Sequence, residues 1–158
     1  MFLSREDIIK HLKNGNIGIE PFNEEHLTPN GYDFSIFEAL VDNKLIKGKD
    51  MLIPAKSHAL LSTAEYVKLG KGIAGQLWQR TSMGRKGIIS SFGLVDAGFE
   101  GNLTLSIYNS SDKDIIIPYL KRFVQMAFVP LSSETEKGYS ELSGNYQGQK
   151  GVTLSKDL

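Results

Sequence analysis

The sequence predicts a mainly β protein, an antiparallel sandwich or barrel with one short N-terminal helix. Short apolar segments alternate with Gly-, Asn- and Ser-containing turns along most of the chain, and helical spacing occurs only near its start. No strand–helix–strand alternation follows, which argues against a dinucleotide-binding fold. With 158 residues, 41% of them apolar, we expect a single domain spanning residues 1–158.

The helix is expected from about Arg5 to Lys13. Ser4 precedes it as an N-cap in a sequence close to a capping box, and Asn14-Gly15 ends it. Its apolar positions recur at helical spacing: Ile8, Ile9 and Leu12.

The segments after the helix read as strands because they are short, apolar or alternating, and bounded by turns. They cover residues 17–19, 32–36, 59–61, 73–79, 103–108, 115–117 and 123–129. Residues 109–112 read as a turn. From about residue 132 the chain is polar and cannot build a core of its own, so residues 132–158 are either disordered or fold over another part of the molecule.

Composition excludes several classes of function. The chain has no cysteine, which excludes disulfides and cysteine-bound zinc and favours a cytoplasmic location. Its three histidines do not fall at metal-ligand spacing. Lys plus Arg and Asp plus Glu number 18 each, which argues against a nucleic-acid partner. No apolar run reaches the roughly 18 residues of a membrane span, and the N-terminus does not resemble a signal peptide, so we expect no membrane partner.

The segment Gln79–Gly87 places cations, hydroxyls and glycines in one bend after a predicted strand. Arg80 and Arg85 offer paired N–H donors, Thr81 and Ser82 offer hydroxyls, and glycines let backbone N–H groups approach a ligand. The segment is therefore either a triphosphate-binding loop or an ordinary solvated turn.

Two acidic residues, Asp96 and Asp33, could each have either a chemical or a purely structural role. Asp96 precedes the glycine-flanked Phe99, where a carboxylate could take a proton from water beside a phosphorus atom. The alternative is a hairpin turn with a buried ring. Asp33, in Asn30–Phe34, either helps to hold Mg²⁺ through water or satisfies turn amides. The Gly-rich, cationic segment Tyr146–Gly151 is suited to closing over phosphate as a lid.

Together these segments resemble the trimeric dUTPase and dCTP deaminase superfamily over nearly the whole chain. Arg80–Gly87 is similar to its Arg-Ser-Ser-x-x-Arg-x-Gly phosphate motif, and Val95–Gly101 to its Ile-Asp-x-Gly-aromatic-x-Gly segment. Further matches follow the superfamily's order: Ser4–Ile9 with Gly15, Pro29–Asp33, Arg122–Met126 and Tyr146–Gly151. The resemblance implies a distorted antiparallel jelly roll (β-clip-like) that forms a homotrimer, with active sites at the subunit contacts.

The resemblance also implies roles for individual residues. The phosphate-binding set would be Arg80, Thr81, Ser82, Arg85, Gln125 and Gln149, with Lys150 in place of a lysine that commonly precedes the tail tyrosine. Phe99 would lie beneath the deoxyribose and exclude a 2′-hydroxyl, and Ser106 and Tyr146 would lie at the sugar and base. Asp96 would lie at the sugar and α-phosphate, and residues 132–158 would act as a lid.

One strand position distinguishes the superfamily's two chemistries. Its metal-free deaminases carry a glutamate in the pattern Leu-Glu-x-x-Asn, whereas this chain reads Leu105-Ser106-Ile107-Tyr108-Asn109. A serine hydroxyl needs a partner base near neutral pH, and no His or Lys close to it in sequence suggests one. We therefore expect a dUTP diphosphatase, in which Asp96 and Mg²⁺ support attack of water on the α-phosphate of dUTP. The alternatives are a dCTP deaminase, mono- or bifunctional, and a non-catalytic nucleotide-binding trimer.

Overall fold

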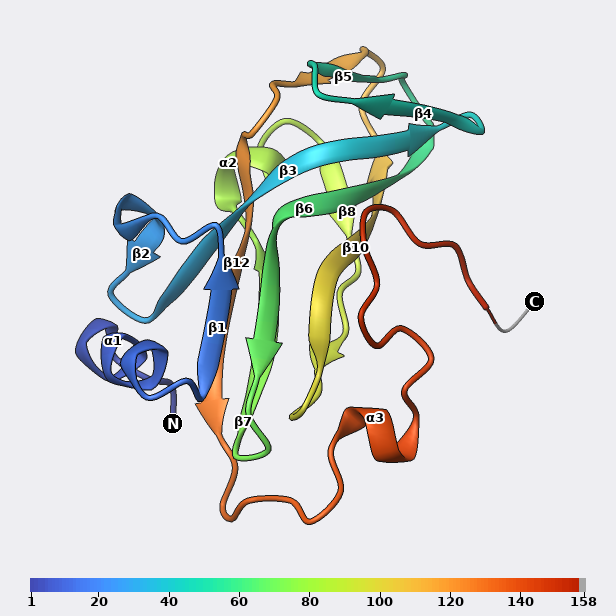
Figure 1. Ribbon diagram of the computed structural model, residues 1–158. Helices are drawn as coiled ribbons and strands as arrows, with labels where there is room; N and C mark the ends of the chain where they lie inside the picture. Colours follow the sequence, from blue (N-terminus) through green and yellow to red (C-terminus); the bar gives the residue numbers. More distant parts are fainter. Residues whose placement is uncertain (157–158) are drawn as a thin grey trace.

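A computed structural model describes residues 1–156 and shows a curled antiparallel sheet that forms most of the molecule. The main path through the sheet is β8-β10-β6-β3-β12-β7-β9; β1 pairs with β6, and β2 and β4 pair with β3. A separate two-stranded sheet joins β5 and β11. The long strands bend around the core like half of a barrel (Figure 1), so the mainly β prediction is confirmed.

The bounds of the elements, in chain order, are α1 (Arg5–Lys13), β1 (Ile17–Glu20), the short 3-10 helix η1 (Glu24–His26), β2 (Leu27–Thr28), β3 (Gly31–Val41), β4 (Lys44–Lys47), β5 (Met51–Ile53), β6 (His58–Leu69), β7 (Ile73–Gln79), α2 (Thr81–Gly84), β8 (Ile88–Ser90), β9 (Leu94–Val95), β10 (Glu100–Asn109), β11 (Ile115–Ile117), β12 (Arg122–Pro130) and α3 (Tyr139–Leu142).

The N-terminal helix α1 has the expected bounds and the expected cap. The Ser4 side chain accepts a hydrogen bond from the Asp7 backbone N–H at 3.2 Å, and Asn14 is the C-cap. Gly15 follows with φ 75°, which is the left-handed conformation that commonly ends a helix. Ile8 is fully buried and attaches the helix to the core. Within residues 1–156, no helix is long and apolar enough to cross a membrane.

The long strands alternate buried and accessible side chains, and this alternation sets the two faces of the sheet. Along β10 the buried positions are Gly101, Leu103, Leu105, Ile107 and Asn109. The side chains between them, Thr104, Ser106 and Tyr108, lie on the opposite face. The core contains the fully buried aromatic side chains Tyr32, Phe34, Phe123 and Phe128. One face of β10 is thus committed to the core, and the other can face a ligand.

The polar tail is packed against the sheet along much of its length. It leaves β12, forms α3 and runs back beside β10 (Figure 1). Gln149 forms an isolated parallel bridge with Gly101, and the Asn102 N–H donates to the Gln149 carbonyl at 2.9 Å. The sequence left open whether the tail is disordered or folds over another part of the molecule. Residues 138–153 fold over the sheet. The last two residues of the expected lid, 157–158, lie outside the described residues.

Candidate functional site

A cavity of about 510 Å³ is lined by residues of β6 and β10, by β9 with the turn that follows it, and by the tail. Four predicted site residues line it: Asp96, Phe99, Tyr146 and Gln149. Its volume falls within the range of about 300–1,000 Å³ that is typical of small-molecule sites. The lining combines apolar side chains with a few polar groups, which suits an organic ring bearing hydrogen-bonding atoms.

Phe99 lies between the turn that connects β9 to β10 and the tail. Its side chain is buried, and its ring meets the Tyr139 ring edge-on with the centroids 5.4 Å apart. The Phe99 N–H donates to the Asp96 carbonyl at 3.1 Å, and Gly98 between them has φ 84°. A Cβ at Gly98 would lie 3.0 Å from Gly138 Cα, so the tail approaches this turn closely. The Phe99 ring at the floor of the cavity is therefore closely packed between the turn and the tail.

The tail closes one side of the cavity through hydrogen bonds that its side chains make to β10 and to the turn before it. Gln149 Nε2 donates to the Asn102 carbonyl at 2.6 Å, and Gln147 Nε2 donates to the Gly98 carbonyl at 3.1 Å. The Gln147 side-chain oxygen accepts from the Glu100 N–H at 3.2 Å. Gln149 Oε1 is buried and has no hydrogen-bond partner among the described residues. A buried acceptor of this kind at a cavity wall is suited to a donor on a ligand.

The predicted phosphate segment lies apart from this cavity within one chain. Thr81 and Ser82 are in α2 and Arg85 follows it; all three are exposed, and none lines the cavity. Figure 1 shows α2 on the other side of the sheet's long strands from the tail. Gln125, on β12, donates from Nε2 to the Thr28 hydroxyl at 2.6 Å, and neither Gln125 nor Lys150 lines the cavity. Of the expected phosphate contacts, only Gln149 lines the cavity of its own chain. Of the expected sugar and base contacts, Phe99 and Tyr146 line it, whereas Ser106 does not.

Asp33 holds arginines instead of presenting an open metal-binding carboxylate. It is only 4% exposed, and its Oδ2 lies 3.3 Å from Arg80 Nη1 and 3.7 Å from Arg122 Nη1. Burial raises the pKa of Asp33, while the two guanidinium groups act in the opposite direction. Among the described residues, no group of three or more His, Cys, Asp or Glu side chains could hold a metal. These contacts do not fit the expected Mg²⁺ ligand and show Asp33 as a residue that orients Arg80.

Ser106 has a partner that sequence proximity did not reveal. Its Oγ lies 2.9 Å from Nε2 of His58, which is the first residue of β6. The two residues are 48 positions apart in the chain, but antiparallel pairing sets Tyr108 opposite His58 and Ser106 opposite Leu60. Ser106 therefore has a histidine partner in space, although none lies close to it in sequence. Because the pairing of β6 with β10 is long-range, no local pattern could have indicated this contact.

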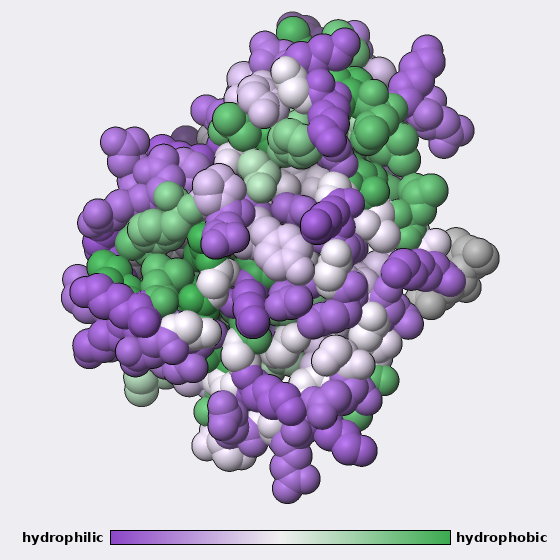
Figure 2. Space-filling model, in the orientation of Figure 1, coloured by the Kyte–Doolittle hydropathy of each residue, from purple (hydrophilic) through white to green (hydrophobic). Residues whose placement is uncertain are grey.

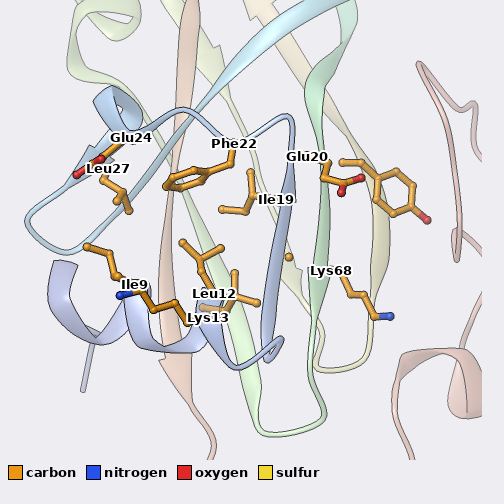
Figure 3. Close-up of a pocket in the computed structure, with 12 residues that line it drawn as sticks. Ile9, Leu12, Lys13, Ile19, Glu20, Phe22, Glu24, Leu27 and Lys68 are labelled. Carbon is orange, nitrogen blue, oxygen red and sulfur yellow. The ribbon is translucent and has the colours of Figure 1, made fainter.

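A second and larger hollow, of about 760 Å³, lies between α1 and β1. Ile9 and Leu12 point from the helix toward Ile19 and Phe22 (Figure 3). Figure 2 shows the corresponding apolar area on the surface, bordered by hydrophilic side chains. Its charged residues belong to the rim, and none of the predicted site residues lines it. We therefore place the candidate site at the smaller cavity.

Comparison with known proteins identifies relatives over most of the chain. The sequence model of the dCTP deaminase-like family matches residues 2–131. A dCTP deaminase of Thermococcus gammatolerans is 44% identical over 142 residues, which are 87% of this chain and 88% of the relative. A dCTP deaminase of Thermococcus sibiricus is 42% identical over 150 residues, 92% of this chain and 94% of the relative.

Solved structures support the same fold. The 2′-deoxycytidine 5′-triphosphate deaminase of Agrobacterium tumefaciens superposes with a TM-score of 0.70 at 15% identity, over 80% of this chain and 47% of that chain. A native dUTPase of EIAV superposes with a TM-score of 0.56 at 15% identity, over 80% of this chain and 98% of that chain. At such identities these structures establish the fold alone.

These comparisons overturn the expectation of a dUTP diphosphatase. The dUTPases are distant structural neighbours, whereas the relatives with substantial sequence identity are dCTP deaminases. The expectation depended on a single position, Ser106, and on the assumption that its hydroxyl has no partner base. The contact with His58 shows that this assumption does not hold. With the family model covering most of the sequence and these relatives covering about nine tenths of it, the chain belongs to the dCTP deaminase-like family.

Proposed function

We propose that this protein is a dCTP deaminase, which converts dCTP and water to dUTP and ammonia. The observation that carries the proposal is the 42–44% identity to dCTP deaminases over 87–92% of the chain. The cavity provides independent support. It has an apolar floor, its walls carry polar groups, and the tail limits the access of water.

Phe99 selects a deoxyribose in this proposal. The Tyr139 ring packs against the Phe99 ring, and the turn at Gly98 fixes the backbone next to it. The ring therefore cannot move away to admit a 2′-hydroxyl. Asp96, exposed in the turn after β9, contacts the sugar. Tyr146 and Gln149 cover the nucleotide from the tail, which acts as the lid. The buried Gln149 Oε1 then gains a hydrogen-bond donor from the bound nucleotide.

The triphosphate is bound by residues from a neighbouring subunit of a homotrimer. Arg80, Thr81, Ser82 and Arg85 are exposed or half-exposed and lie away from their own chain's cavity, so a second copy is needed to complete the site. Asp33 holds the Arg80 guanidinium in place before the ligand arrives, which lowers the entropic cost of binding. Gln125 and Lys150 also contact the triphosphate. Mg²⁺ accompanies the triphosphate and is held by its phosphate oxygens, since the described residues offer no metal-binding cluster.

Product analysis of purified protein with dCTP, dUTP and CTP in parallel reactions tests the proposal. We expect dCTP to yield dUTP and ammonia, and CTP to be used at least about a hundredfold less efficiently, because a blocked hydroxyl costs several kcal/mol. If dCTP is recovered unchanged while dUTP is hydrolysed, the proposed function is refuted. If CTP is deaminated as well as dCTP, the role of Phe99 is refuted and the reaction class stands.

A further inference from the structure

We propose that the Ser106 hydroxyl and the His58 imidazole form a proton relay for deamination of the cytosine ring. This inference rests on the proposed function. It is carried by the 2.9 Å contact between Ser106 Oγ and His58 Nε2, by the position of His58 in the cavity lining, and by the place of Ser106 opposite Leu60, another lining residue.

Strand geometry places the pair on the ligand-facing side of the sheet. His58 and Leu60 on β6 line the cavity, as does Thr104 on β10. Ser106 lies directly opposite Leu60 and two residues after Thr104, and therefore shares their face. The contact with His58 is the diagonal cross-strand pairing that such a register brings within reach. The relay thus extends from the cavity wall along one face of the β6–β10 pair.

The chemistry requires a group that can both accept and return a proton. When the water oxygen bonds to C4, one water proton must leave and N3 must gain one. The C4 hydroxyl proton must then reach the amino group, so that the C4–N bond breaks, ammonia departs and a C4 carbonyl remains. A serine hydroxyl alone cannot accept a proton near neutral pH, whereas histidine takes up and releases protons there.

The relay supplies both transfers without any further reactant. The leaving water proton passes to Ser106 Oγ as the serine hydroxyl proton moves to His58 Nε2, and the reverse movement delivers a proton to N3. A second cycle carries the C4 hydroxyl proton to the departing amino group. Water and cytosine are consumed, uracil and ammonia are formed, and both side chains return to their starting protonation states.

Other ionisable side chains at the cavity are less suited to this task. Asp96 lies before β10 begins, whereas His58 pairs with Tyr108 near the end of that strand, so the two occupy different ends of the β10 strand. A nucleotide with its sugar at Asp96 and Phe99 directs its base along β10 toward Ser106. Apart from His58 and Asp96, the ionisable side chains among the described lining residues are the phenols of Tyr139 and Tyr146, which belong to the tail and not to the β6–β10 pair.

Steady-state deamination of dCTP by full-length variants tests the relay. We expect His58→Ala to lower kcat by about 10²–10⁴-fold with little change in KM, because proton transfer and not binding is lost. Ser106→Ala should show the same pattern, while Ser106→Thr, which keeps a hydroxyl, should retain most activity. His11→Ala is the matched control, since that histidine lies on α1 away from the cavity, and its kcat should equal that of wild type.

A double variant separates a relay from a structural role of His58. Ser106→Glu places a carboxylate, which can carry protons itself, where the serine stands. We expect His58→Ala/Ser106→Glu to regain at least tenfold in kcat over His58→Ala. If wild type deaminates dCTP and His58→Ala does so equally well, the relay is refuted while the proposed function stands. If wild type does not deaminate dCTP, the proposed function itself is refuted.

Discussion

Gly101 is where the tail and the floor of the cavity meet, and replacing it tests how closely they depend on each other. Its φ is 154°, and a Cβ there would lie 3.0 Å from Phe99 Cζ, 3.1 Å from Gln149 Cγ and 3.2 Å from Gln149 N. Gly101→Ala must therefore shift both the ring and the tail in addition to adopting a backbone conformation that suits glycine. We expect a loss of about 2–3 kcal/mol in the free energy of unfolding, a fall in Tm of roughly 4–12 °C.

Gly148→Ala separates the backbone cost from the steric cost. Gly148 also has a positive φ, 71°, but no atom lies within 4 Å of the position where its Cβ would be. This variant should lose only about 1 kcal/mol and keep the KM for dCTP. Gly101→Ala should raise that KM about tenfold, the equivalent of 1.4 kcal/mol of lost lid contact. Thermal melts and dCTP kinetics measure both quantities, and equal values for the two variants would refute the proposed coupling.

Two further predictions concern buried polar side chains. Asn109 is fully buried, donates to the carbonyls of Ile53, Pro54 and Lys113 at 2.9–3.1 Å, and accepts from the N–H and hydroxyl of Ser111. Asn109→Asp removes the donors and should lower the free energy of unfolding by about 3 kcal/mol, measured by urea denaturation; an unchanged midpoint at pH 7 would contradict this. Burial raises the pKa of Glu65 above its ordinary 4.5, so the folded state holds a proton more tightly than the unfolded state. Stability is therefore lost as the pH rises from about 4.5 through the folded pKa. Relative to wild type, Glu65→Gln should become progressively more stable over that window, while the exposed Glu136→Gln should not; parallel Tm curves for Glu65→Gln and wild type would refute the assignment.

Local sequence determined some elements fully. Ser4 and the Asn14-Gly15 pair define both ends of α1, and the predicted bounds of β7 and β11 agree with the structure. These elements are specified by caps, turns and periodicity within a few residues. The strands β4, β8 and β9 were not predicted. They are as short as β11 but do not have its uninterrupted run of three isoleucines, and they are defined by their pairing with β3, β10 and β7.

The candidate site was predictable to a similar degree. Asp96, Phe99, Tyr146 and Gln149 meet at one cavity, as their order in the chain and the resemblance suggested. His58 was missed because its contact with Ser106 depends on the register of two strands far apart in sequence. That omission led to the wrong choice between the superfamily's two reactions. The arginine contacts of Asp33 were not predicted for a related reason, because Arg80 and Arg122 lie far from it in sequence.

We propose that this protein catalyses attack of water on the cytosine ring of dCTP and leaves the phosphoanhydride intact. Simultaneous measurement of ammonia and nucleotide products during turnover of dCTP tests it most directly. We expect one ammonia for each dUTP formed, at a rate that falls by two orders of magnitude or more in His58→Ala. Persistence of dCTP without any ammonia, together with release of pyrophosphate from added dUTP, would contradict the claim.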